Sequence, residues 1–280
     1  MAGQAMSLYE DFRHLSPAAA VFVRYAARPQ SVALAGVIVL TALGAAILGV
    51  LMAKSGSGDF AAFKMFCGAK STAEMNAAMA LALSFAGLAA IALVMMLPSA
   101  APMLLTYAEI ADTSAAKGIA AVSPLVLAAG YLAVWIAFAL TASFAEILLP
   151  PLIAPSPQQA ALLAGTSLVL AGLYQFTALK HACLSRCRRP FAFFFANWTD
   201  RAAGVFRLGL QQGLYCLGCC WALMLMMLAL GAMNLVWMAG LAAIMTAEKM
   251  TRSQIWPRAV GVALIAAGAV FFAQITPFAR

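Results

Sequence analysis

Long apolar runs with almost no charge constrain the fold of this chain more than any other feature. Runs of spanning length lie at residues 31–53, 79–107, 122–149, 159–179 and 259–276. Each could cross about 30 Å of hydrocarbon as an α-helix, which takes roughly 20 residues. Because unpaired backbone groups are costly in lipid, such segments are expected to be helical. The sequence therefore predicts an all-α fold, a polytopic transmembrane helical bundle.

The stretch from Leu208 to Ala247 is too long for a single span. Its 40 residues would form a helix about 60 Å long, twice the thickness of the hydrocarbon core. The segment Gly231-Ala232-Met233-Asn234 supplies turn-forming residues near its middle. We therefore expect two spans here and about seven in the whole chain.

The charges indicate how the spans are oriented. Only 9% of the residues are charged, whereas soluble domains carry about 25%, so the chain cannot cover a water-facing surface. With the N-terminus in the cytoplasm, the outer segments hold four of the 17 basic residues, Lys54, Lys64, Lys70 and Arg280. The other thirteen lie inside, as the positive-inside rule requires. The net charge of +8 then reflects the topology of the chain in its membrane, and nucleic acid is not expected as a partner.

Five of the six cysteines lie in two short clusters, His181-Ala-Cys183-Leu-Ser-Arg-Cys187 and Cys216-Leu-Gly-Cys219-Cys220. Residues four apart share one face of a helix, so Cys216 lies beside Cys220 and Cys183 beside Cys187. The second cluster sits in an apolar stretch rich in methionine. Thiolate and thioether sulfur together suit a soft ion such as Cu(I), with zinc as the second choice.

Several sulfur groups fall at one predicted depth in the membrane. Counting about 1.5 Å per residue from the cytoplasmic end of each span places Cys216 about 12 Å and Cys220 about 18 Å deep. By the same count Met96 lies about 16 Å deep, if its span ends near residue 107, and Met238 about 14 Å deep. The predicted metal site near the bilayer midplane comprises Cys216, Cys219, Cys220, Met96 and Met238, with Met95, Met103 and Met224 beside them and Cys183, Cys187 and His181 at the cytoplasmic mouth.

Each of these residue types also has a plain structural role. Methionine fills gaps between helices, and a buried cysteine behaves as a small hydrophobic residue. The inner segment 180–207 combines basic residues with Phe191, Phe193, Phe194, Phe195 and Trp198. That mixture is typical of a helix lying at the membrane surface.

Four motifs in order carry a resemblance to a known family. They are residues 95–103, residues 171–184, residues 213–224, and residues 231–238 followed by Glu248-Lys249. In these residues the chain resembles a bacterial family of predicted metal-binding integral membrane proteins, from about Leu81 to Gly268. The resemblance implies metal binding and copper handling, with no established activity. It divides the chain into an N-terminal segment, residues 1–78, with the first span and an outer loop, and a membrane domain, residues 79–280, with about six spans.

Two classes of function follow. The first is a membrane protein that binds copper(I) and transports it or delivers it to an accepting protein. The alternative is an accessory or assembly subunit of a larger membrane metalloenzyme complex. We do not expect an enzyme. The enzyme class considered, a thiol–disulfide oxidoreductase, requires its reactive cysteines on the oxidising side of the membrane, whereas both clusters here map to the cytoplasmic half.

Overall fold

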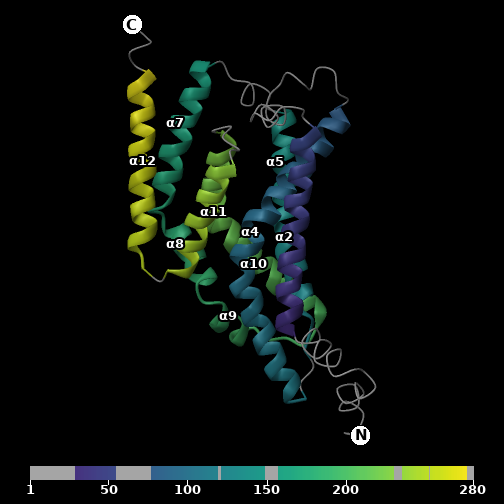
Figure 1. The fold of residues 1–280 in the computed structure, drawn as a ribbon. Coiled ribbons are helices and arrows are strands. Elements are labelled where there is room, and N and C mark those ends of the chain that lie inside the picture. The colour runs from purple at the N-terminus through teal and green to yellow at the C-terminus, as the bar shows by residue number, and fades with distance from the viewer. Residues whose placement is uncertain are drawn as a thin grey trace.

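The computed structural model describes residues 29–54, 77–118, 121–148, 157–229, 235–251 and 253–275. Cys67 and most of the predicted outer loop lie outside the described residues. Within them the chain forms nine helices and no strand (Figure 1), namely α2 (Pro29–Lys54), α4 (Ala77–Ala116), α5 (Pro124–Leu148), α7 (Pro157–Tyr174), α8 (Ala178–Cys187), α9 (Pro190–Ala196), α10 (Ala202–Ala229), α11 (Leu235–Met250) and α12 (Ile255–Ile275). The predicted all-α fold is confirmed.

Five of these helices, α2, α4, α5, α10 and α12, are long and apolar enough to cross a membrane. Helices α7 and α8 meet at 67° and add a sixth span if the bent pair counts as one. The stretch 208–247 divides in two as predicted, because α10 ends at Ala229 and α11 begins at Leu235. A multi-pass membrane protein is therefore supported, while a total of seven spans stays a prediction.

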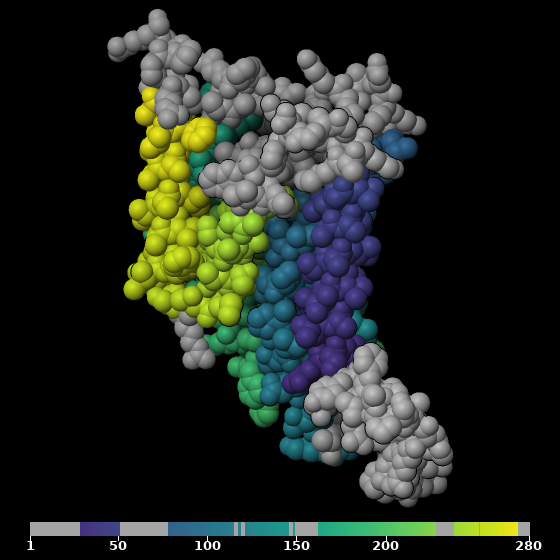
Figure 2. Space-filling view, viewed as in Figure 1, coloured from purple at the N-terminus to yellow at the C-terminus, as the bar shows by residue number. Residues whose placement is uncertain are grey.

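Helices α2 and α12 form the flanks of the bundle. Only 22% of the most apolar window of α2 and 17% of that of α12 is buried, against 50% for α10. Figure 2 shows these two helices at opposite edges of one face, with α4 and α11 between them. They present large apolar side chains such as Ile38, Val39 and Val262 on the outside. An exterior of this kind is suited to hydrocarbon rather than water.

Helix α4 runs unbroken through Pro98 and Pro102 and extends nine residues beyond its predicted end near residue 107. Hydroxyl groups gather along this part of the helix. Ser99 Oγ and Tyr131 Oη both donate to the carbonyl oxygen of Met96, over 2.8 and 3.2 Å. Neither proline removes the helical donor of this carbonyl, because the N–H groups missing at Pro98 and Pro102 would face the carbonyls of residues 94 and 98. The Tyr131 bond also ties α5 to α4.

Helices α5 and α10 cross at a pair of glycines. A β-carbon added at Gly130 would lie 2.2 Å from the carbonyl oxygen of Phe206, and one added at Gly209 would lie 2.2 Å from that of Leu127. Small residues at such a crossing let two backbones approach closely. The crossing sets how far α10 is rotated, and so which of its side chains face α4.

We expect Gly209→Ala to destabilise the protein by about 1–3 kcal/mol, because the added carbon must push α5 away from α10. The midpoint of thermal unfolding in detergent measures the effect. Gly240→Ala on α11 is the matched control, since a β-carbon there meets no atom within 4 Å and alanine favours the helix. Equal midpoints for the two variants would contradict the close crossing.

Candidate metal centre

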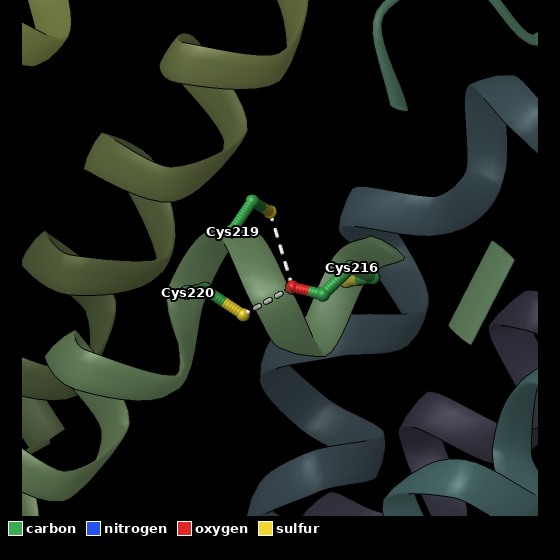
Figure 3. A group of neighbouring side chains, drawn as sticks. All are labelled: Cys216, Cys219 and Cys220. Atoms are coloured by element: carbon green, nitrogen blue, oxygen red, sulfur yellow. Dashed lines mark hydrogen bonds between the residues drawn. The ribbon is translucent and has the colours of Figure 1, made fainter. Parts of the chain in front are cut away.

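The cysteines of α10 form a compact and buried group. Cys216, Cys219 and Cys220 are each at most 2% exposed, and their sulfur atoms all lie within 4.8 Å of one another. Figure 3 shows the sulfur atoms of Cys219 and Cys220 directed at the carbonyl oxygen of Cys216, over 3.1 and 2.9 Å. The predicted shared face of the helix is confirmed.

A methionine on a second helix contacts this group. The Sδ atom of Met96, on α4, lies 4.0 Å from the Sγ atom of Cys220, and Met96 is fully buried. Sulfur from α4 and α10 therefore meets at one level inside the bundle. The depth of Met96 and Cys220 in the membrane stays a prediction, because α4 continues nine residues past the end from which the depth of Met96 was counted.

The other predicted methionine ligands are buried as well, but no hydrogen-bonding contact joins their sulfur atoms to a thiol in the described part of the chain. Met95 and Met103 lie on α4, Met224 lies on α10, and Met238 lies on α11. Met96 is the described methionine whose sulfur makes a hydrogen-bonding contact with a thiol. A role for the other four as ligands stays a prediction.

Helix α8 brings the second cysteine cluster against the first. The Sγ atom of Cys183 packs onto Gly218, where an added β-carbon would lie 2.6 Å from it. The Cys187 thiol lies within hydrogen-bonding reach of the Cys219 thiol. Cys183 and Cys187 thus share the face of α8 that contacts α10, as the spacing predicts.

His181 is placed differently from these two cysteines. Its Nδ1 atom is buried and has no hydrogen-bond partner among the described residues. No described contact joins its imidazole to a thiol. The structure therefore brings together the sulfur atoms of the two clusters, while a ligand role for His181 stays a prediction.

Sequence reasoning missed the polar groups that surround Cys216. Lys249 Nζ donates to Cys216 Sγ over 3.2 Å and to Ser99 Oγ over 2.6 Å. The hydroxyl of Tyr131 lies 3.1 Å from the same sulfur atom. An ammonium and a phenol stabilise negative charge on a thiolate. No local signal could have found Lys249, since a lysine near the end of a spanning helix can equally reach outward to the membrane surface.

A buried ion pair links α8 to α11. Lys180 Nζ lies 2.7 Å from Glu248 Oε2, and the two side chains are 1% and 2% exposed. Arg188 Nε also donates to the carbonyl oxygen of Glu248, over 2.8 Å. The cytoplasmic side predicted for Lys180 and Lys249 stays a prediction; the structure places Lys180 fully inside the protein and Lys249 against the Cys216 thiol. The pair holds α8, with its two cysteines, against the bundle.

Some aromatic residues of segment 180–207 lie at the protein surface and others are buried. Phe191 and Phe195 are 60% and 74% exposed, whereas Phe194 is fully buried. The ring of Phe194 packs edge-on against that of Tyr107, with centroids 5.4 Å apart. The predicted surface helix is thus two short helices, α8 and α9, anchored on α4 and α10.

The donor set fits a soft metal ion. Two sulfur atoms on opposite sides of an ion, with metal–sulfur bonds of about 2.3 Å, are about 4.6 Å apart. The three thiols lie within 4.8 Å of one another, so small side-chain rotations could close them around one ion. Thiolate and thioether donors select copper in its reduced state or zinc over hard cations.

Comparison with known proteins agrees with this chemistry. Residues 88–271 match the model of the PpoB2 family, described as a copper chaperone. The match spans both cysteine clusters and Met96. No curated protein and no solved structure matches the chain. The family description supports copper binding, as the resemblance in the motifs implies. With the match covering well over half of its length, the chain belongs to the PpoB2 family of copper chaperones.

Proposed function

We propose that this protein is a membrane copper chaperone that holds one Cu(I) ion on Cys216, Cys219 and Cys220, with Met96 as a further ligand. One observation carries the proposal: three buried thiols lie within 4.8 Å of one another, and one of them contacts a buried thioether. Soft donors in a dry site favour Cu(I) over zinc, whose structural sites use thiolate and imidazole. The other methionines, Met95, Met103, Met224 and Met238, are proposed to extend the sulfur-lined path.

The cysteines of α8 are proposed to exchange the ion with the central site. Cys187 lies within hydrogen-bonding reach of Cys219, so copper can pass between them by forming one Cu–S bond as another breaks. Cys183 and His181 would complete this second copper site on α8. Such exchange leaves the oxidation state unchanged, and it suits delivery of copper to an accepting protein.

We further propose seven spans with a cytoplasmic N-terminus in a bacterial inner membrane. Helix α11 would be a short span, and the bent pair of α7 and α8 would be another. Figure 1 supports an odd number of crossings, because α2 begins and α12 ends at opposite ends of the bundle. Residues 1–78 would then contribute the first span and an outer loop to a membrane domain formed by residues 79–280.

Copper analysis of the purified protein tests the proposed site. Full-length protein from copper-supplied cells, in detergent, is expected to hold about one copper per chain in a shell of sulfur, because the three thiols and Met96 offer soft sulfur donors, which Cu(I) prefers. Elemental analysis gives the ratio, and X-ray absorption gives the oxidation state and ligand type. A stable complex with other subunits and no copper would instead favour the alternative, an accessory or assembly subunit of a metalloenzyme.

A further inference from the structure

A cavity of about 300 Å³ leads from the surface to Cys216, one of the three central cysteines. Met250, on its wall, is 71% exposed, whereas Cys216, also on its wall, is 2% exposed. Two thiols face this space, Cys216 from the central cluster and Cys187 from α8. The cavity is therefore a route by which a small molecule could reach both cysteine clusters from one side.

The charged groups of this cavity are cations. Lys249 and Arg188 line it, and no carboxylate does so among the described residues. Two of the three N–H donors of Lys249 bind Cys216 and Ser99, which leaves one for another partner. A wall with two cations and no carboxylate among the described residues is suited to an anion.

Gln212 supplies a second, independent observation. Its side chain lines the cavity and is 2% exposed, and its amide nitrogen has no hydrogen-bond partner among the described residues. Leaving a buried amide unpaired costs roughly 1–3 kcal/mol. A bound acceptor, such as a carboxylate oxygen, would satisfy it.

From this arrangement we infer that the cavity binds a small anionic thiol that carries Cu(I), and that it is the loading site of the chaperone. The carboxylate of the carrier would lie against Lys249 and Gln212, which places its sulfur-bound copper beside Cys187 and Cys216. The inference rests on the proposed copper site and names the class of molecule that supplies it. A cavity of this volume admits an amino-acid-sized or small peptide thiol.

The loading step is a ligand exchange with no change of oxidation state. A Cu–S bond to Cys216 or Cys187 forms, and the Cu–S bond to the carrier breaks. The proton of the attacking thiol passes to the departing carrier thiolate, so the carrier leaves as a free thiol. Copper remains Cu(I) throughout, and no reductant or energy source is needed.

The test compares two carriers that differ only in charge. Full-length protein in detergent is mixed with Cu(I) bound to N-acetylcysteine, which has a carboxylate, or to N-acetylcysteine amide, which is neutral. Copper bound to the protein is followed in time after rapid desalting. We expect loading from the acid to be about tenfold faster, the factor that corresponds to one charge-assisted hydrogen bond.

Variants locate the effect in the cavity. Gln212→Leu should reduce the preference for the acid several-fold, and Lys249→Gln should reduce it further. Gln211→Leu is the matched control, because Gln211 is the neighbouring amide on α10 and does not line the cavity. It should keep the full preference for the acid.

The outcomes separate this inference from the proposed function. Cu(I) supplied in acetonitrile, with no thiol, measures the capacity of the copper site alone. If the wild type takes up copper from acetonitrile but loads equally fast from the acid and the amide, the inference is overturned. If it takes up copper from no source, the proposed copper site itself is wrong. A preference for the acid that survives Gln212→Leu and Lys249→Gln would also overturn the inference, because the anion would then bind elsewhere.

Discussion

Cys216→Ser is expected to strip the purified protein of nearly all its copper. Loss of an outer-shell partner alone lowers metal affinity 10- to 100-fold, so loss of a thiolate ligand should cost more than about 100-fold. Cys216 is also the residue on which the site converges, since its carbonyl oxygen accepts from both other thiols and its sulfur contacts Lys249 and Tyr131. Elemental analysis after dialysis against a Cu(I) chelator measures the retained copper.

A series of variants with graded effects distinguishes loss of a copper ligand from misfolding. Cys220→Ser should lose copper as Cys216→Ser does. Met96→Leu, which removes one thioether, should weaken retention less. Met227→Leu is the control, since Met227 is buried on the same helix but outside the thiol group, and leucine conserves its volume. Wild-type copper content in both cysteine variants would refute the site.

Lys180→Met is expected to destabilise the fold by about 3–5 kcal/mol, the usual cost of removing one partner of a buried ion pair. Glu248 would remain as a charge with 2% exposure, and its second carboxylate oxygen already lacks a hydrogen-bond partner among the described residues. The midpoint of thermal unfolding in detergent should fall accordingly. The variant should also lose contact between α8 and α11, which the pair joins.

The double variant Lys180→Met with Glu248→Leu separates the cost of an unpaired buried charge from the cost of altered packing. Replacing both charges by apolar groups of similar volume is often neutral or stabilising, so most of the lost stability should return. If the single variant unfolds at the wild-type midpoint, the ion pair is not formed in the protein. If the double variant is as unstable as the single one, the cost arises from packing and not from the unpaired charge.

The helical periodicity of the cysteines could be predicted because it is local. The rise and turn of an α-helix decide that Cys216 and Cys220 share a face, whatever lies opposite. Depth was less predictable, because the count for Met96 depends on where α4 ends, and that end lies nine residues beyond the expected one. The copper-handling family was likewise evident in motifs that the match to residues 88–271 confirms.

The surroundings of the thiols could not be predicted in the same way. Lys180 and Lys249 lie near predicted span ends, where a long side chain can equally reach outward to the membrane surface. Their inward direction depends on partners 68 and 33 residues away, Glu248 and Cys216. Nothing in the local sequence specifies such a pairing.

Apolar runs and cysteine spacing in this chain determined an all-α membrane bundle with two sulfur-bearing helix faces, because hydrocarbon enforces helices and each helix sets its own periodicity. The tertiary structure alone decided which groups meet at those faces: the thioether of Met96, the ammonium of Lys249, the phenol of Tyr131. Those meetings depend on the rotation and crossing of separate helices, which close packing such as that of Gly130 against Gly209 sets.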